Sequence, residues 1–349
     1  MGSPYRILYV GQLDAARHNT ATQRMLGLED LGHELVPLDS QLSPEPALLR
    51  QLRRVRRKLF RVITHPSLDR EILEQVESKR PDILWIDKGD SIDPRTLASA
   101  RKLQPDLRIV GFCPDDMMNP DNKTRFFVEC LPHYDIYFTT KSFAVPELKA
   151  LGCPKAVFVD NSYDPTLHRP IELTAAERER LGSPVGFIGF AEGERAESVA
   201  ALGRAGIPVK VWGNGWAAYR KCMPPSVDLA GPCHWGEDYA KVINSFDINL
   251  AFLRKCNRDL QTTRTMEIPA CGKMMLAERT NEHRALFEEG VEAEFFGSDE
   301  ELLKKTRYYL DHPEERERIA AAGRRRCVEG GHSNQERLES MLETLEELR

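Results

Sequence analysis

The feature that most constrains the fold is a repeated alternation of short apolar runs with segments of helical periodicity. In the first half of the chain the apolar runs predict strands at 6–10, 34–37, 83–86, 109–112, 136–139 and 156–159. The segments between them predict helices at 20–31, 48–63, 68–79, 93–103 and 142–151. Strands that alternate with helices are typical of an α/β domain with a parallel sheet, because each helix returns the chain to the same end of the sheet.

The alternation stops after residue 160 and then restarts. Residues 161–184 are polar, interrupted by prolines and without a strand pattern, which is typical of a connection between domains. Beyond them the sequence predicts strands at 184–190, 209–213, 247–252, 274–277 and 294–296, and helices at 192–205, 299–312, 314–327 and 333–349. We therefore predict two doubly wound α/β domains, at 1–165 and 184–330, joined by a linker at 166–183.

Composition narrows the class of protein. A net charge of −5 with 30% charged residues argues against a dedicated nucleic-acid binder. No apolar run approaches the roughly 20 residues of a membrane span, and the N-terminus leads directly into a strand, so we expect no secretory leader. The 8 cysteines form no CxxC pair, which favours reduced thiols over disulfides or a zinc site. These features predict a cytoplasmic globular protein.

A glycine follows the first predicted strand of each half. Gly11 follows the first strand, and Gly189 with Gly193 precede a predicted helix. Glycine at this position allows a ligand to approach the backbone, and a helix N-terminus favours anions. Neither site matches the GxGxxG pattern of dinucleotide-binding proteins, and no P-loop motif occurs. The alternative is that these residues are turn glycines.

The segment TTRTMEIPACG, at 262–272, places hydroxyls, an arginine and a carboxylate on a short predicted helix between two buried strands. Thr262, Thr263 and Thr265 at the helix start offer hydroxyls and free backbone N–H groups to phosphates. Glu267 lies four residues after Thr263, on the same helix face, and a carboxylate suits a ribose diol because it accepts two hydrogen bonds. The alternative is that Thr262 is an N-cap and Glu267 a solvated helix residue.

Basic residues surround this segment. Arg264, Arg258 and Lys255 could neutralise the charge that develops on a leaving diphosphate.

Residues 247–326 resemble the donor-binding half of GT-B glycosyltransferases, through RTMEIPACG and the following HPEERERIAAAGRRR. The resemblance is closest to the CgeB-like branch of the family 4-type enzymes, which is named for a spore-maturation protein. The first half is similar to the same branch through PDILWIDKG, GFCPDDMMNP and YDIYFTTKSFAVPELKALG. The resemblance implies a GT-B fold, in which two Rossmann-like domains face each other across a cleft. It further implies that 1–165 binds the acceptor, that 184–330 binds the donor, and that a helix in 331–349 packs back on the first domain.

The resemblance also assigns roles to residues. Family members carry two acids separated by seven residues, and Glu267 matches the second, which binds the ribose hydroxyls. Asp259 stands where the first acid would approach the sugar, although it is one methylene shorter than glutamate, and LQTTRTM replaces the usual glycine-rich loop. Trp212, Gly213 and Asn214 match a loop that lines the base pocket, where Trp212 would either stack on the base or belong to the core.

Other candidates lie in the first half. Lys88, Asp115 and Asp116 follow predicted strands and would face the cleft, where they either act on the acceptor or cap a turn. His18, after the Gly11 loop, is the histidine best placed to reach the sugar. The adjacent aspartates are not the DxD pattern with which GT-A enzymes hold manganese. Because GT-B enzymes use helix ends and basic residues instead, we expect no metal ion and no cofactor.

The basic stretch, residues 50–61, lies in LLRQLRRVRRKLFRVI. Its leucines and valines recur at helical spacing beside many arginines, which predicts a core-packed helix with a solvated basic face. The alternative is a peripheral contact with anionic lipid at the inner membrane face, or with a phosphorylated acceptor.

The sequence thus predicts a metal-independent glycosyltransferase of the hexosyltransferase type. It would move a sugar from a UDP- or GDP-sugar, with retention of configuration, to an acceptor that is a saccharide, a lipid-linked molecule, a protein or a natural product. No nucleic-acid partner is expected. The alternatives are a GT-B-fold sugar-nucleotide epimerase or hydrolase, and a sugar-nucleotide-binding protein without catalysis.

Overall fold

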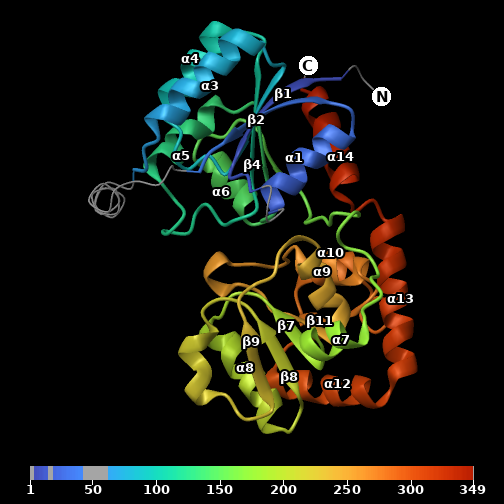
Figure 1. The fold of residues 1–349 in the computed structure, drawn as a ribbon. Helices are drawn as coiled ribbons and strands as arrows, with labels where there is room; N and C mark the ends of the chain where they lie inside the picture. Colours follow the sequence, from blue (N-terminus) through green and yellow to red (C-terminus); the bar gives the residue numbers. More distant parts are fainter. Residues whose placement is uncertain (1–3, 15–18, 42–61, 349) are drawn as a thin grey trace. The chain divides into compact units, whose positions relative to one another are not determined.

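The computed structural model describes residues 4–14, 19–41 and 62–348. It divides the chain into two compact units, unit 1 (Met1–Asp160 with Gln335–Arg349) and unit 2 (Asn161–Asn334), which are described separately (Figure 1). Each unit contains a six-stranded parallel sheet with helices on both faces, so the predicted α/β fold is confirmed. His18, the basic stretch and residues 48–61 of the helix predicted at 48–63 lie outside the described residues. Within the described part of the chain, no helix is both long and apolar enough to cross a membrane.

The sheet of unit 1 has the strand order β2-β1-β3-β4-β5-β6. Its strands are β1 Arg6–Gly11, β2 Glu34–Asp39, β3 Ile83–Asp87, β4 Arg108–Cys113, β5 Ile136–Thr139 and β6 Ala156–Phe158. Its helices are α1 Thr20–Asp30, α3 Pro66–Lys79, α4 Pro94–Leu103, α5 Arg125–Cys130, η1 Leu131–His133, α6 Ala144–Ala150 and α14 Asn334–Glu346. The order reverses at β1, which is the mark of a doubly wound sheet.

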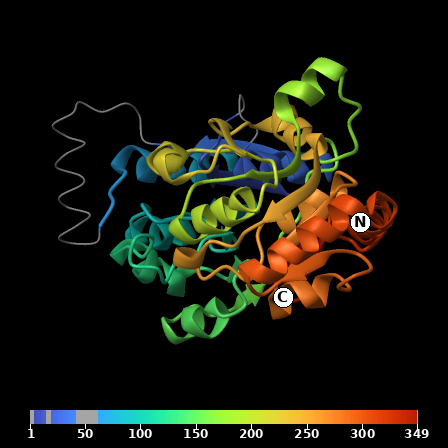
Figure 2. The ribbon, with the colours of Figure 1, turned by 90° about the horizontal axis from the view of Figure 1, so that it is seen from below.

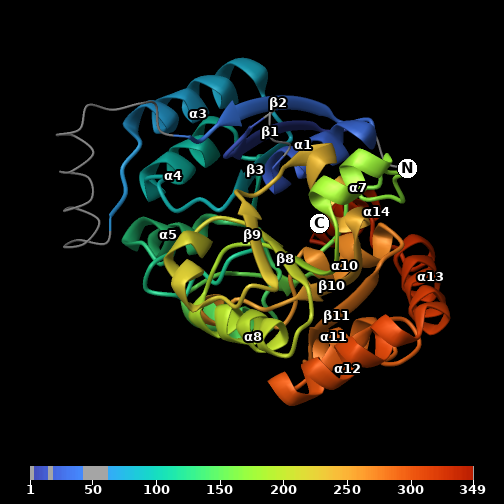
Figure 3. The same ribbon diagram turned by 60° about the horizontal axis from the view of Figure 1, so that its bottom comes forward.

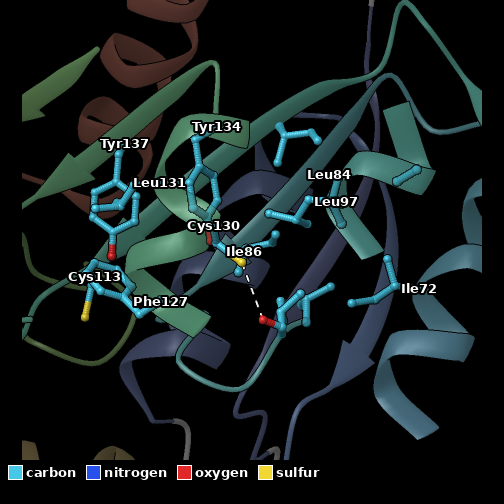
Figure 4. Packing of buried hydrophobic residues seen from close by; sticks show 14 of the residues in the cluster. Ile72, Leu84, Ile86, Leu97, Cys113, Phe127, Cys130, Leu131, Tyr134 and Tyr137 are labelled. Atoms are coloured by element: carbon cyan, nitrogen blue, oxygen red, sulfur yellow. Dashed lines mark hydrogen bonds between the residues drawn. The ribbon is translucent and has the colours of Figure 1, made fainter. Parts of the chain in front are cut away.

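Two layers of helices bury the sheet of unit 1. On one face the apolar residues of α3, α4, α5 and α6 pack on the strands. Figure 4 shows residues of α3, α4 and α5 in this cluster. In α3 these are Leu68, Ile72 and Val76, which recur every four residues and so share one side of the helix. On the other face α1 and α14 pack against β1 and β3. Because both faces are covered, strands such as β3 (ILWID) are buried throughout, which explains their continuous apolar sequence.

The sheet of unit 2 has the order β12-β11-β10-β7-β8-β9. Its strands are β7 Ser183–Ile188, β8 Val209–Trp212, β9 Val227–Gly231, β10 Phe246–Ala251, β11 Met274–Glu278 and β12 Glu294–Phe296. Its helices are α7 Ala175–Leu181, α8 Gly193–Arg204, η2 Trp216–Cys222, α9 Gly236–Ser245, η3 Lys255–Asn257, α10 Arg264–Ala270, α11 Asn281–Leu286, α12 Asp299–Asp311 and α13 Pro313–Glu329.

The helices of unit 2 also form two layers. Side chains of α8 and α12 share one apolar cluster with the sheet, and those of α9, α10 and α11 share the other. Figure 3 shows the ribbons of α8, α10, α11 and α12 around this sheet. The helices α12 and α13, orange-red in Figure 2, contact each other. The strand order reverses between β7 and β10, so the connections that follow these two neighbouring strands lead to opposite faces.

Several elements of unit 2 were not predicted from the sequence, among them the helices α7, α9 and α11 and the strand β9. The predicted linker at 166–183 contains α7, which starts with a capping box in which Thr174 and Glu177 satisfy each other's backbone N–H groups. The strand β9 was not predicted, because as an edge strand it is only partly buried and lacks a continuous apolar run.

Candidate functional site

The candidate ligand-binding site of unit 2 lies at the carboxyl ends of β7 and β10. The two strands are neighbours in the sheet, and β7 leads into α8 while β10 leads towards α10. Because these helices cover opposite faces, the two loops diverge and leave an open position between them. Open α/β sheets bind their ligands at such a point.

Two arginines meet at this position. Arg195, in the first turn of α8, is only 4% exposed. Its Nε and Nη1 donate to the backbone oxygens of Leu253 (3.3 Å) and Phe190 (2.9 Å), but its buried Nη2 has no hydrogen-bond partner. Arg264, the first residue of α10, has a buried Nε that likewise lacks a partner. The guanidinium carbons of Arg195 and Arg264 lie 5.7 Å and 5.6 Å from the ring centroid of Phe187.

The arginine pair is short of negative charge. Burial, and then the neighbouring charge of Arg264, lower the pKa of Arg195 to about 10, whereas Glu192 and Asp259 act in the opposite direction. A buried guanidinium beside a like charge, with an unused N–H group, is complementary to an anion with several acceptor oxygens, such as a phosphate. Arg195 was not selected from the sequence. Its signal is a basic residue in the first helical turn after the Gly189 loop.

Glu267 lies further along α10 and is buried, with 4% of its surface exposed. Its Oε2 accepts a hydrogen bond from Tyr239 Oη at 2.5 Å, and its Oε1 lies 3.8 Å from His168 Nε2. The interpretation of Glu267 as a solvated helix residue is therefore wrong. Tyr239 and His168 were also not selected from the sequence, because they are distant from Glu267 along the chain.

The threonines before and within α10 stabilise the turn that carries Arg264. Thr265 Oγ1 accepts a hydrogen bond from the backbone N–H of Thr262 at 3.0 Å and lies 2.9 Å from His283 Nε2. His283 Nδ1 lies 2.6 Å from the backbone oxygen of Glu278, which can only accept, so Nδ1 carries the hydrogen and Nε2 accepts from Thr265. Burial lowers the pKa of His283 to about 4, which keeps the ring a neutral acceptor at pH 7.

This arrangement revises the roles expected for the threonines. Thr265 is fully buried and already hydrogen-bonded, so it supports the turn. The N-cap position belongs to Thr263, without a side-chain hydrogen bond, so the N-cap interpretation of Thr262 is wrong. The buried Oγ1 of Thr262 has no hydrogen-bond partner.

The loop between β10 and α10 also contains the other acid expected at the site. Asp259 is buried, and its Oδ1 accepts from Asn257 Nδ2 at 2.7 Å. Arg258 adopts a left-handed backbone conformation with φ of 49°. Lys255, which was expected to neutralise a leaving group, forms an ion pair with Glu278.

A cavity of ≈ 920 Å³ lies beside the arginine pair, at the carboxyl ends of β10, β11 and β12. Its lining includes Phe190, Glu192, Arg195, Arg254, Lys255 and Glu278. Two ion pairs lie in its walls, Glu192 with Arg254 at 2.9 Å and Lys255 with Glu278, and the lining also includes the acidic residues Glu194, Glu197 and Asp299.

The predicted base-pocket residues have structural roles. The buried indole of Trp212 donates from Nε1 to the backbone oxygen of Leu181 at 3.3 Å and packs edge-on against His234, so we no longer expect it to stack on a base. A Cβ on Gly213 would lie 1.8 Å from the backbone oxygen of Gly189, which shows that this glycine is required for close approach of two loops. Asn214 is exposed, and its backbone oxygen accepts from Ala191 N–H at 3.0 Å.

In unit 1 the structure brings together two of the predicted residues. Lys88 has a left-handed backbone with φ of 74°, and its Nζ lies 3.8 Å from Asp115 and 3.9 Å from Asp90. Asp116 is buried and accepts from the backbone N–H of Met118 at 2.9 Å, as expected for a turn-capping residue. A Cβ on Gly11 would lie 3.0 Å from the Tyr9 ring, so Gly11 has a packing reason to be glycine.

A buried ionic cluster in unit 1 was not predicted. Asp87, at the end of β3, accepts hydrogen bonds from Tyr9 Oη (2.8 Å) and from Arg24 Nε (3.0 Å) and Nη2 (2.6 Å). The Arg24 guanidinium also lies over the ring of Phe112, 4.2 Å from its centroid. Among the described residues of the chain, no group of three or more His, Cys, Asp or Glu side chains could hold a metal ion.

Comparisons with known proteins agree with this architecture. Residues 195–343 match the model of a family described as "Glycosyl transferase-like". Anabaena Alr3699/HepE in complex with UDP and glucose is similar over 98% of this chain and 99% of that one, with 13% identity and a TM-score of 0.64. Sucrose-phosphate synthase from Thermosynechococcus elongatus is similar over 99% of both chains, with 11% identity and a TM-score of 0.71.

A third solved structure, a putative UDP-N-acetylglucosamine 2-epimerase from Listeria monocytogenes, is similar over 97% of this chain and 95% of that one, with 14% identity and a TM-score of 0.60. No curated protein sequence matches the chain. Structural similarity at such low identity establishes the fold, which is GT-B, and residues 195–343 share the sequence features of glycosyl transferase-like proteins.

Proposed function

We propose that the chain is a glycosyltransferase that takes a sugar from a nucleoside diphosphate donor, either a UDP- or a GDP-sugar. The observation that carries this proposal is the arginine pair, in which Arg195 and Arg264 each keep a buried N–H group without a partner. The match of residues 195–343 to glycosyl transferase-like proteins supports it. So do solved structures of the same fold, since those of the Anabaena protein contain UDP with glucose, or UDP-glucose.

The proposed chemistry follows from the charges at the site. When the bond between the sugar C1 and the diphosphate oxygen breaks, its electron pair stays on that oxygen. Arg195 and Arg264 would stabilise the new charge, and the burial of Arg195 and of the Nε of Arg264 makes this stabilisation stronger than it would be in water. An acceptor oxygen forms the new bond to C1 and loses its proton. We propose that the leaving phosphate takes this proton on the same side of the sugar, so that configuration is retained.

Other residues have proposed roles in binding. Glu267 would accept hydrogen bonds from the ribose hydroxyls, and Asp259 would approach the sugar. Lys88 and Asp115 are our candidates for the acceptor. The acceptor would be a saccharide, a lipid-linked molecule, a protein or a natural product. We also propose that no metal ion is needed, because two guanidinium groups supply the positive charge, and that the chain belongs to the CgeB-like branch.

The test is titration of UDP and GDP against wild type, Glu267→Ala, Glu267→Gln and Asp259→Ala, with sugar transfer measured with and without EDTA. Glu267→Ala should bind the nucleotide about 10- to 150-fold more weakly than wild type, because a hydrogen bond to a charged group is lost. The affinity of Glu267→Gln should lie between the two. Asp259→Ala should bind the free nucleotide normally but transfer less sugar. Equal binding by wild type and Glu267→Ala would show that Glu267 does not contact the nucleotide. Activity that is lost in EDTA and restored by manganese or magnesium would contradict metal independence.

An epimerase is the second candidate, because a putative UDP-N-acetylglucosamine 2-epimerase shares the fold over nearly all of the chain. It would use the same donor site but would release an epimeric nucleotide-sugar without an acceptor. Product analysis therefore separates the two enzymes. A protein that binds the donor but leaves it unchanged with every acceptor tested would be a binding protein.

A further inference from the structure

Only one of the two carboxylate oxygens of Glu267, Oε2, accepts a hydrogen bond from the described residues. Tyr239, in the first half of α9, donates from Oη to Oε2 of Glu267 at 2.5 Å. The His168 ring packs edge-on against the Tyr239 ring, with centroids 5.8 Å apart and an interplanar angle of 80°. This contact limits movement of the tyrosine ring, and so fixes the direction from which the hydroxyl reaches Glu267.

The second oxygen of the carboxylate retains its capacity to accept. His168 Nδ1 accepts from the backbone N–H of Asp164 at 3.0 Å, so the neutral ring carries its hydrogen on Nε2. That Nε2 lies 3.8 Å from Oε1 of Glu267, which exceeds hydrogen-bond length. Among the described residues, Oε1 therefore receives no hydrogen bond, although an ionised carboxylate accepts about four.

We propose that Tyr239 is a positioning residue for nucleotide binding, which fixes Oε2 of Glu267 so that Oε1 is presented to the 2′- and 3′-hydroxyls of a ribose. This inference rests on the proposed function, in which Glu267 binds the ribose. Two adjacent hydroxyls bind one carboxylate more tightly when its orientation is already fixed, because a freely rotating carboxylate would lose entropy on binding. Burial, and then the charge of Glu267, raises the pKa of Tyr239 well above its usual value, so the hydroxyl remains a donor at neutral and mildly alkaline pH.

The experiment compares ribose with deoxyribose. Calorimetric titration would measure the binding of UDP and 2′-deoxy-UDP, or of GDP and 2′-deoxy-GDP, to wild type and to Tyr239→Phe. We expect Tyr239→Phe to bind the ribonucleotide about tenfold more weakly, the loss of roughly one hydrogen bond to a charged group. The affinity for the deoxynucleotide should fall by less. The ratio of ribonucleotide to deoxynucleotide affinity should therefore be smaller in Tyr239→Phe than in wild type. If the role of Tyr239 is purely structural, Tyr239→Phe should bind both nucleotides more weakly by the same factor.

The chain offers a matched control in the same unit. Tyr309 Oη, on α12, donates to Oε1 of the buried Glu294 at 2.6 Å, which is an equivalent tyrosine–glutamate hydrogen bond outside the site. Tyr309→Phe should leave the affinity for both nucleotides unchanged. Glu267→Gln should remove the effect of Tyr239, so adding Tyr239→Phe to Glu267→Gln should weaken binding by less than a factor of about two.

The outcomes separate the two proposals. If wild type binds neither UDP nor GDP, the proposed function is wrong and this inference fails with it. If wild type binds a nucleotide and prefers ribose, and Tyr239→Phe prefers it equally, only the positioning role is overturned. The role is also overturned if Tyr239→Phe has its full effect in the Glu267→Gln background.

Discussion

Unit 1 and unit 2 each carry arginines that are at least partly buried at the carboxyl edge of the sheet, but they differ in how the charge of these arginines is balanced. In unit 1, Arg24 donates two hydrogen bonds to Asp87, which also accepts from Tyr9. In unit 2, Arg195 and Arg264 lie over the same ring, and each has an N–H group without a partner. The same location in the same kind of sheet thus holds a closed ionic cluster in one unit and an open cationic one in the other.

The difference shows how a structural charge can be separated from a functional one. A buried charge is tolerated when it is paired and its hydrogen-bonding groups are satisfied. The protein itself satisfies Arg24, so the cluster with Asp87 and Tyr9 belongs to the stability of unit 1. Arg195 uses only part of its hydrogen-bonding capacity, and an anionic ligand would accept from the N–H groups that lack a partner. Substitutions in the two clusters should therefore have different consequences.

The largest effect is expected in unit 1. Asp87→Ala leaves Arg24, whose side chain is only 12% exposed, without its counter-ion, which should lower the free energy of unfolding by about 3–5 kcal/mol. Urea denaturation measures the loss, and hydrogen exchange of β1 and β3 would locate it in unit 1. Asp115→Ala is the control, since that carboxylate is partly exposed and should change stability by about 0.5 kcal/mol or less. A loss below about 1 kcal/mol for Asp87→Ala would show that the cluster does not stabilise the unit.

A smaller effect, on binding instead of stability, is expected in unit 2. Arg195→Met removes one of two like charges but also two hydrogen bonds to backbone oxygens, so the free energy of unfolding should change little. The affinity for UDP or GDP should fall by about 1.5–3 kcal/mol, or about 10- to 150-fold. Calorimetry measures the affinity, with Arg204→Met, an exposed arginine of the same helix, as control. Unchanged nucleotide binding together with lower stability would mean that Arg195 resembles Arg24 after all.

The smallest effect concerns His283 in unit 2. This residue stabilises the Thr262–Thr265 turn as a neutral hydrogen-bond acceptor, whereas the two arginines carry the charge of the site. The pKa of His283 is about 4 in the folded chain and about 6.5 when unfolded. Between these values only the unfolded chain takes up the proton, so stability should fall as the pH is lowered. From pH 6.5 to pH 5, wild type should lose about 1–2 kcal/mol more than His283→Gln.

Urea titrations at both pH values test this expectation, with His312→Gln as control, because His312 is exposed. If His283→Gln loses as much stability on acidification as wild type does, His283 is not the buried neutral group described above.

Much of the fold was predictable from the sequence because both sheets are buried on both faces. Their inner strands must then be apolar over most of their length, as in ILWID of β3 and MMLAE of β11, where only the last residue is charged. The strand β9 was not predicted because an edge strand is only partly buried and therefore need not be apolar. The helix α7 escaped because most of its residues are polar, and only its capping box indicates where it starts.

The candidate site was less predictable, because it depends on contacts between residues far apart in sequence. Arg264, Asp259 and Glu267 lie within one segment, so a local pattern could identify them as candidates. Arg195 joins Arg264 only because β7 and β10 are neighbours in the sheet. Sequence reasoning also cannot tell whether a tryptophan is satisfied in the core, as Trp212 is through its hydrogen bond to Leu181.

The return of the chain to unit 1 has a consequence for biosynthesis. The helix α14 supplies Leu338, Met341, Leu342 and Leu345 to the apolar cluster around β1 and β3. Translation proceeds from the N-terminus, and unit 2 (Asn161–Asn334) is made as one continuous piece before α14 exists. Part of one face of the first sheet therefore stays uncovered while the whole of unit 2 is synthesised. In the nascent chain, the unit that is made first is the last to be completed, and it is the one that most needs protection from aggregation on the ribosome.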